Sequence, residues 1–321
     1  TQDSFLQDCR PCGLVSFAAP MDTHAWDGLR GGEEATMPDL KGKVAVVTGA
    51  SRGAGRGIAL ALGAAGATVY VTGRTLRGGP KPSDGAPGTV EDTAEEVSSR
   101  GGVGIPVRVD HTIEAEVTAL FERVQKEQGR LDVLANAVWG GSEVIMQMNW
   151  SRPFWEQPLE GWQQMMMAGT YAYLLASRHA AKLMATQRKG LIVHVTDLID
   201  TDGTHYRGQI FWDLSHECIN RMVLGMSGEA KRYHIAVLAL NPGFMRTERV
   251  LMHLKTEEMK KAYHFDKSES PEYIGRAVAA LAADAKAFEK TGRLLHVADL
   301  AREYGFTDID GRYIPRFDPH H

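Results

Sequence analysis

The stretch KVAVVTGASRGAGRGIAL, residues 43–60, gives the clearest indication of how this chain folds. Its apolar start predicts a buried strand, and its small and aliphatic end predicts a helix. The glycines between them, Gly49, Gly53 and Gly55, permit a tight turn and a close approach to the helix N-terminus. Free N–H groups and the helix dipole bind anions at such a terminus, so the stretch predicts a phosphate-binding strand–turn–helix unit.

The same alternation of short β-rich runs and longer amphipathic runs continues along the chain. Helices are predicted between the strands, and the two longest cover 161–187 and 211–233. Further strands are predicted at 67–73, 104–110, 131–136, 191–195, 236–240 and 293–297. Seven strands alternating with helices predict a single α/β, Rossmann-like, doubly wound domain with a parallel sheet, whose ligands bind at the carboxyl ends of the strands.

The sequence divides into three parts. Residues 1–38 are polar, acidic and rich in Gly and Pro, and we expect an N-terminal arm pinned against the body or against a neighbouring subunit. Residues 39–298 hold the sheet domain, and residues 299–321 form a C-terminal tail. Cys9 and Cys12 have the C-x-x-C spacing of redox and zinc sites, but there is no second pair, which favours incidental thiols over a metal or redox site.

The composition is that of a soluble globular protein. Of the 321 residues 43% are apolar, enough for a large core, and the net charge is only −4 with no basic run. These features exclude a disordered chain and predict neither a nucleic-acid partner nor a membrane span. Three cysteines favour a reducing, intracellular setting, and the scattered histidines predict no metal site. The expected partner is a small molecule or another protein.

Polar residues also close three other predicted strands. Asp110 ends the third, Asn136 ends the fourth, and Asn241-Pro242-Gly243 ends the sixth. Together with TGASRGAG (48–55), this set resembles the short-chain dehydrogenase/reductase family over roughly residues 41–300. The motifs FWEQP and PGFMRTE resemble one bacterial and eukaryotic branch of that family. The resemblance implies the same fold and an NAD(P)-dependent oxidoreductase.

The resemblance also implies how a nicotinamide dinucleotide is held. Asp110 would bind the adenine amino group, and Asn136 would steady the central strands. The Pro242-Gly243 turn, with Thr247, would hold the nicotinamide carboxamide. The second asparagine of the family's N-N-A-G motif is Ala137 here, so that motif is only half present.

The charge around the second strand bears on the choice of cofactor. An acidic residue there would bind a ribose diol, but the sequence has Arg74 after that strand and Arg52 in the glycine turn, which favours NADP over NAD. The alternative is that both arginines are only solvated surface residues. The residues expected to hold the cofactor are Gly49, Ser51, Arg52, Gly53, Gly55, Arg74, Asp110, Asn136, His216, Pro242, Gly243 and Thr247.

The family's catalytic set is replaced in this chain. That set is a tyrosine, a lysine four residues later, a serine at the end of the fifth strand and an asparagine in the preceding helix. Counting back from the end of the sixth strand by the family's usual spacing places Trp212 at the tyrosine and His216 at the lysine. The serine position falls at Thr196 or Asp197, and the asparagine position at about Gly169.

Trp212 and His216 differ in the chemistry that they can perform. An indole N–H does not release its proton in the pH range accessible in water, so Trp212 cannot serve as the proton donor. An imidazole can bond a ribose hydroxyl and carry charge near neutral pH, so His216 can still serve cofactor binding. The candidates for a relocated acid or base are Asp197, His205, Tyr206 and Asp213. The alternative is that Asp213 caps or decorates the helix start and the others are ordinary loop residues.

Two segments bear on substrate and assembly. Residues 139–167 are rich in Trp and Met, which suits either a flexible apolar substrate pocket or packing against the core or another subunit. Residues 169–184 have the small and apolar residues of a helix that the family commonly uses for dimerisation. The resemblance therefore implies a homodimer or homotetramer, and a larger complex is also open.

Three functions remain open at this stage. The first is an NADP(H)-binding protein without ordinary reductase activity, in a structural, regulatory or complex-subunit role. The second is an NADP-dependent carbonyl or alcohol oxidoreductase with a relocated proton donor. The third is a lyase or isomerase that uses Asp197 or His216 as a base in the same cleft. Fold alone does not separate them, because function belongs to the site.

Overall fold

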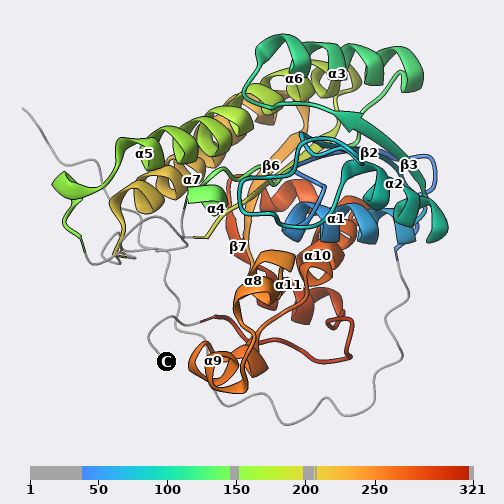
Figure 1. The fold of residues 1–321 in the computed structure, drawn as a ribbon. Coiled ribbons are helices and arrows are strands. Elements are labelled where there is room, and N and C mark those ends of the chain that lie inside the picture. The colour runs from blue at the N-terminus through green and yellow to red at the C-terminus, as the bar shows by residue number, and fades with distance from the viewer. Residues whose placement is uncertain (1–37, 145–151, 198–205, 207, 318–321) are drawn as a thin grey trace, which may run out of the picture. The chain divides into compact units, whose positions relative to one another are not determined.

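A seven-stranded parallel sheet organises the protein in the computed structural model, which describes residues 38–144, 152–197, 206 and 208–317 (Figure 1). The strand order is β3-β2-β1-β4-β5-β6-β7. The predicted α/β, Rossmann-like, doubly wound fold is therefore confirmed. The strands are β1 (Val44–Thr48), β2 (Thr68–Gly73), β3 (Val103–Arg108), β4 (Val133–Asn136), β5 (Gly190–Val195), β6 (Ile235–Asn241) and β7 (Leu294–His296).

The strand order places a topological switch between β1 and β4. From β1 the chain winds outward through β2 to β3, then returns to build β4 on the other side of β1. In register, Val47 pairs with Ala135, and Thr48 pairs with Asn136. Crossover connections therefore diverge at the carboxyl ends of these two strands, which is where open α/β sheets bind ligands.

Helices cover both faces of the sheet and bury its side chains. One face packs against α1, α2, α10 and α11, and the other against α3, α6 and α7. Every residue of β1 and β6 is buried, as expected for strands covered on both sides. The longer helices are α1 (Gly53–Ala64), α2 (Val90–Ser99), α3 (Glu114–Gln128), α6 (Ala172–Gln187), α7 (Ile210–Ala230), α10 (Pro271–Ala283) and α11 (Val297–Tyr304).

Shorter helical segments connect these elements. They include α4 (Gly141–Val144), α5 (Leu159–Met165), α8 (Glu248–His253) and α9 (Glu257–Ala262). The 3-10 segments are η1 (Phe154–Glu156), η3 (Lys231–Tyr233), η4 (Phe265–Lys267) and η5 (Ala287–Lys290). Helices α8 and α9 follow β6, and α9 lies below the sheet in Figure 1. Residues of both helices line the ligand cavity described below.

The helix predicted at 161–187 is interrupted. Between α5 and α6 lies the π-helical segment η2 (Met166–Tyr171), in which Ala168 has φ −91° and ψ 29°. Such π turns often mark functional sites, because they turn side chains out of the regular helical path. Apolar spacing alone does not reveal this turn, since one extra residue changes the pattern little.

Helix α11 crosses the boundary predicted at residues 298/299. Its buried residues Val297, Leu300 and Ala301 belong to the same core as α1 and α10. The N-terminal arm, with Cys9 and Cys12, lies outside the described residues, and Cys218 lies on α7. None of the helices in the described ranges has the length and apolar character needed to cross a membrane.

Candidate cofactor and active site

A cavity of about 1020 Å³ opens at the carboxyl ends of the strands. The glycine turn after β1 lines one part of it, the segment after β6 lines another, and residues of α8 and α9 close it further. Of the residues predicted to hold a cofactor, all but Gly55 and Asn136 line this cavity. Among the described residues, no group of three His, Cys, Asp or Glu side chains is placed to hold a metal ion.

The glycine turn cannot be built from other residues. Gly49 has φ +66°, and a Cβ there would lie 2.8 Å from the backbone oxygen of Ala137. A Cβ on Gly55 would lie 2.4 Å from the backbone oxygen of Gly49. The turn therefore brings bare backbone to the start of α1, and Ser51, buried, completes it. This is the cradle that a pyrophosphate needs.

An anion already sits at the start of α1. The backbone N–H of Gly53, the first residue of the helix, donates a hydrogen bond to a carboxylate oxygen of Glu248 at 2.7 Å. Glu248 is the first residue of α8. The turn thus has the anion-binding geometry that the sequence predicts, with a side-chain carboxylate in the place of a phosphate oxygen.

Asn136 supports the sheet from within. It is fully buried, and its Nδ2 donates to the Ser177 hydroxyl at 3.0 Å and to Nδ1 of His194 at 3.2 Å. Burial lowers the pKa of His194 to about 3, so the ring is neutral and its Nδ1 can accept that bond. Asn136 therefore ties β4 to α6 and β5, consistent with the steadying role that the resemblance implies.

Asp110 and Arg74 stand at the other end of the cavity. Asp110 accepts hydrogen bonds from the backbone N–H and the hydroxyl of Thr112, at 2.9 and 2.7 Å. Burial raises the pKa of Asp110, but these bonds and the nearby Arg74 outweigh it, so the pKa is lowered and the group is ionised at neutral pH. The exposed Arg74 lines the same end.

Arg52 joins the glycine turn to the loop between β2 and α2. Its guanidinium donates to the backbone oxygens of Pro87 and Gly88, at 2.9 and 2.7 Å, and to the Thr75 hydroxyl at 3.2 Å. The loop is therefore drawn over the turn. Both predicted arginines, Arg52 and Arg74, line this end of the cavity.

A cluster of aromatic side chains lies at the positions assigned from the sequence to the catalytic tyrosine and lysine. On the first turns of α7, the indole N–H of Trp212 donates to Oδ2 of Asp197 at 2.9 Å. Nδ1 of His216 lies 2.9 Å from the backbone oxygen of Trp212. The His216 ring centroid lies 4.4 Å from that of Trp139 and 4.7 Å from that of Trp212. We call Trp139, Asp197, Trp212 and His216 the tryptophan–histidine cluster.

The tautomer of His216 follows from its partner. A backbone carbonyl only accepts hydrogen bonds, so Nδ1 of His216 must carry a proton. The side chain is only 6% exposed, which restricts it to one place on the cavity wall.

The π-helical segment makes room for Trp139. Gly169, near the family's asparagine position, faces this indole, and a Cβ on Gly169 would lie 2.9 Å from the Trp139 ring. The same crowding occurs at Gly141, where a Cβ would lie 2.7 Å from the indole. The two glycines therefore leave the space that the Trp139 indole occupies. Its contact with His216 has no local signal in the sequence.

The other predicted acids and bases do not meet at the site. Thr196, at one of the two serine positions, lines the cavity, but it is buried and donates its hydroxyl to Oδ1 of Asn220 at 2.7 Å. Tyr206 is 59% exposed and does not line the cavity. Asp213 does not line it either, and the side chain that caps α7 is that of Gln209, which accepts from the Trp212 N–H. Asp213 therefore does not cap α7, but it lies in the first turn of this helix, as the other part of that expectation has it. His205 lies outside the described residues.

The side chains of the Trp- and Met-rich run, residues 139–167, lie in different environments. Trp139 lines the cavity, whereas Trp155 is 71% exposed and Trp162 packs edge-on against Phe211. Trp150 lies outside the described residues. Other apolar residues that line the cavity come from the segment after β6 and from the C-terminal segment. They are Phe244, Met245, Leu254, Met259, Tyr263 and Phe317.

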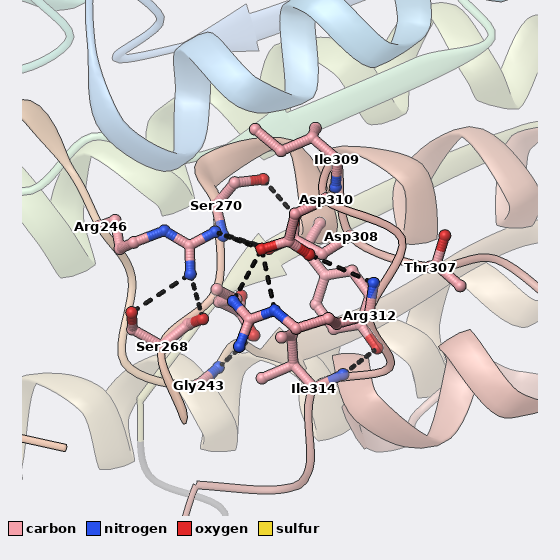
Figure 2. Close-up of polar contacts among 12 residues, drawn as sticks. Gly243, Arg246, Ser268, Ser270, Thr307, Asp308, Ile309, Asp310, Arg312 and Ile314 are labelled. Atoms are coloured by element: carbon pink, nitrogen blue, oxygen red, sulfur yellow. Dashed lines mark hydrogen bonds and ion pairs between the residues drawn. The ribbon is translucent and has the colours of Figure 1, made fainter. Parts of the chain in front are cut away.

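A buried polar group lies beneath the Pro242-Gly243 turn. A carboxyl oxygen of Glu269 accepts from the Gly243 N–H at 3.0 Å, and burial raises the pKa of Glu269 to about 8. Next to it Arg246 donates to Asp308 at 2.9 Å, and Asp308 also accepts from the Ser270 N–H at 2.8 Å (Figure 2). Sequence reasoning missed this group, because a glutamate in a polar loop resembles a solvated one.

Comparison with known proteins identifies the family. The short chain dehydrogenase family matches residues 43–258. Dehydrogenase/reductase SDR family member 1 from Mus musculus is 39% identical over 281 residues, which cover 85% of each chain. The chain belongs to the short-chain dehydrogenase/reductase family. The resemblance inferred from the sequence is thus confirmed, and with it a family that binds nicotinamide cofactors.

Solved short-chain dehydrogenases share the fold. One from Mycobacterium thermoresistibile has a TM-score of 0.72 at 23% identity, covering 87% of this chain and 95% of its own. A 7α-hydroxysteroid dehydrogenase complexed with NADH and 7-oxo glycochenodeoxycholic acid has a TM-score of 0.65 at 23% identity, covering 80% and 93%. Against this family background, the tryptophan–histidine cluster is the feature that needs a functional explanation.

Proposed function

We propose that this short-chain dehydrogenase/reductase binds NADP(H) but lacks the family's ordinary reductase activity, and that it serves a structural or regulatory role. The observation that carries the proposal is the tryptophan–histidine cluster. The positions that should hold tyrosine and lysine hold Trp212 and His216, which pack against each other and against Trp139.

The cavity residues fit a dinucleotide. Gly49 and Gly55 leave backbone where a pyrophosphate needs close approach, and the Gly53 N–H already binds an anionic group. Asp110, ionised, would accept from the adenine amino group. Arg52 and Arg74 at that end favour the 2′-phosphate of NADP over a free ribose diol. When bound, the nicotinamide supplies or accepts a hydride.

The residues beside the nicotinamide end do not supply the accompanying proton in the family's usual way. The Trp212 indole N–H is donated to Asp197, and an indole does not release that proton at accessible pH. Thr196, at one of the two serine positions, donates its hydroxyl to Asn220. Without a titrating phenol, general acid catalysis of the family's kind loses a factor of about 10² to 10⁴.

Equilibrium binding tests the cofactor half of the proposal. We expect NADPH to quench tryptophan fluorescence at lower concentrations than NADH, because Trp139 and Trp212 line the cavity. We also expect the wild type to show no turnover on a panel of aldehydes and ketones. Failure of both nucleotides to bind, or brisk wild-type turnover, would overturn the proposal.

Restoring the family pair tests the catalytic half. The double variant Trp212→Tyr with His216→Lys should gain NADPH-dependent carbonyl reduction, because it supplies a phenol and the ammonium that lowers its pKa. Each single variant is the matched control and should remain inactive. Activity in the Trp212→Tyr single variant would show that His216 can replace the lysine.

A second candidate function rests on His216. His216 lines the cavity, and an imidazole can carry a proton near neutral pH, which suits an NADP-dependent oxidoreductase with a relocated donor. Wild-type turnover that His216→Gln abolishes while NADPH affinity stays the same would establish this function. If the wild type turned over no carbonyl substrate, this second function would be excluded and only the first proposal would remain.

We further propose that the protein assembles as a homodimer through α6 and α7. These helices pack against each other and carry exposed apolar side chains, Leu174 on α6 and Leu214 and Leu224 on α7. Large exposed apolar side chains on adjacent helices are typical of subunit interfaces. Light scattering should give twice the chain mass of 35.2 kDa, and Leu224→Glu should lower it.

A further inference from the structure

The start of α8 is placed directly against the phosphate-binding turn. Gly53 begins a helix of 12 residues, and its N–H is bonded to the Glu248 carboxylate at 2.7 Å. Thr247, next in sequence, caps α8 by accepting from the Val250 N–H at 3.3 Å. Because α8 is capped at Thr247, the Glu248 side chain leaves the first turn of one helix and meets the first N–H of another.

A carboxylate and a phosphate oxygen compete for such a place. Both are anions that the free N–H groups and the dipole of α1 stabilise, and the Gly53 N–H can donate to only one of them at a time. Two like charges at contact distance also repel each other. Glu248 and a dinucleotide pyrophosphate therefore exclude each other at this turn.

A second contact holds α8 over the cleft. Arg249 forms an ion pair with Asp84 of the loop between β2 and α2, and both side chains are mostly buried. Burial raises the pKa of Asp84, but the hydrogen bonds from Arg249 and the Ala86 N–H, together with the charge of Arg52, outweigh it, so the pKa is lowered and the pair is charged at neutral pH. Arg52 fastens the same loop to the glycine turn. The loop, the turn and α8 thus form one closed ring of contacts across the cavity mouth.

We propose that Glu248 is an internal competitor for the dinucleotide phosphate, which keeps the cleft closed until cofactor displaces it and α8 moves. This inference rests on the proposed NADP(H) binding at the same site. The apparent affinity for nucleotide is then reduced by the fraction of molecules in which Glu248 occupies the turn. Cofactor binding and opening of α8 are coupled, because the ligand binds only the displaced state.

Neutralising the competitor should tighten binding. In Glu248→Gln we expect the Kd for NADPH to fall by about 3- to 10-fold, the range of an anion's stabilisation at a helix N-terminus. The Kd for NADH should fall by the same factor, since both nucleotides carry the same pyrophosphate. Glu257→Gln is the matched control, because this exposed glutamate on α9 pairs only with Lys260 among the described residues. An unchanged or weaker affinity in Glu248→Gln would overturn the proposal.

Amide exchange tests the contact without any nucleotide. The Gly53 N–H should exchange with solvent faster in Glu248→Ala than in the wild type, because its acceptor is removed. Equal exchange rates would also overturn the proposal. If no variant binds either nucleotide while Gly53 is protected by Glu248, the proposed function fails and the carboxylate is a structural cap. If all variants bind NADPH equally, the proposed function stands and the competition fails.

Discussion

The two ends of the same cavity differ in what builds them. The cofactor end is built from backbone, with N–H groups and bare glycines at the turn after β1. The other end depends on side chains, among them Trp212 and His216, which we propose stand in place of the family's catalytic pair. A backbone site survives as long as the fold does, whereas a side-chain site is lost by two substitutions. Binding and chemistry are thus separable in one fold.

The largest effect is expected from a substitution in the glycine turn. Gly55→Ala should lower the free energy of unfolding by more than about 3 kcal/mol and abolish NADPH binding, because its Cβ would meet the Gly49 oxygen at 2.4 Å. Chemical denaturation and fluorescence titration measure both effects. Gly225→Ala on α7 is the control, since its Cβ meets nothing within 4 Å. Intact NADPH binding in Gly55→Ala would show that the turn does not hold the cofactor.

The pH dependence of stability tests the support beneath the Gly243 turn. The folded pKa of Glu269 is about 8, well above its ordinary 4.5, so the folded state holds a proton that the unfolded state has released. The stabilisation of the folded state by protonated Glu269 is complete below pH 4.5 and is lost as the pH rises towards 8. The groups around it are Arg246, Asp308 and Tyr273.

Between pH 6 and pH 8, the wild type should therefore lose about 2 kcal/mol of unfolding free energy relative to Glu269→Gln. The glutamine keeps an acceptor for the Gly243 N–H but does not titrate. Urea denaturation at several pH values measures the difference. Parallel pH profiles for the two proteins would mean that Glu269 is ionised or solvated in the folded state.

The preference for NADPH over NADH tests the part of the cavity that contains Arg74. Arg74→Ala should weaken NADPH binding by about 10-fold and leave NADH nearly unchanged, because only NADPH has a 2′-phosphate for the guanidinium to bind. Arg77→Ala is the matched control, since Arg77 lies on the same loop but pairs with Asp92 and Glu95. Equal losses for both nucleotides would assign Arg74 a general role in the fold of the loop.

The smallest expected effect concerns the start of α7. Gln209→Ala should cost about 0.5 to 1 kcal/mol of unfolding free energy, because the Gln209 side chain accepts the Trp212 N–H at 2.6 Å. The affinity for NADPH should not change, since Gln209 does not line the cavity. Asp213→Asn is the comparison variant, and a larger loss there would return the capping role to Asp213.

The sequence allowed most of the backbone site to be predicted. Repeated apolar runs placed all seven strands, and the glycine spacing placed the turn at Gly49 because few other arrangements need glycines at those positions. The family resemblance also located Trp212 and His216. Local patterns are sufficient for such features, since their causes lie within a few residues of chain.

The remaining features depend on residues far apart in the chain. Glu248 and Gly53 are 195 positions apart, so no local pattern connects them. Glu269 looks like a solvated residue, and only the tertiary packing of the C-terminal segment buries it. The π turn at Ala168 changes helical periodicity too little to be noticed. Burial and long-range pairing decide these details, and both require the folded structure.

The group around Asp308 has a consequence for synthesis of the protein. Arg246 and Ser270 depend on Asp308, which lies 62 and 38 residues further along the chain. On a ribosome, the glycine turn and its strands emerge early, but the segment after β6 stays without this partner until translation passes residue 308. A nascent chain should therefore acquire its nucleotide-facing turn well before its other wall. Stalling translation before and after Asp308 would separate the two stages.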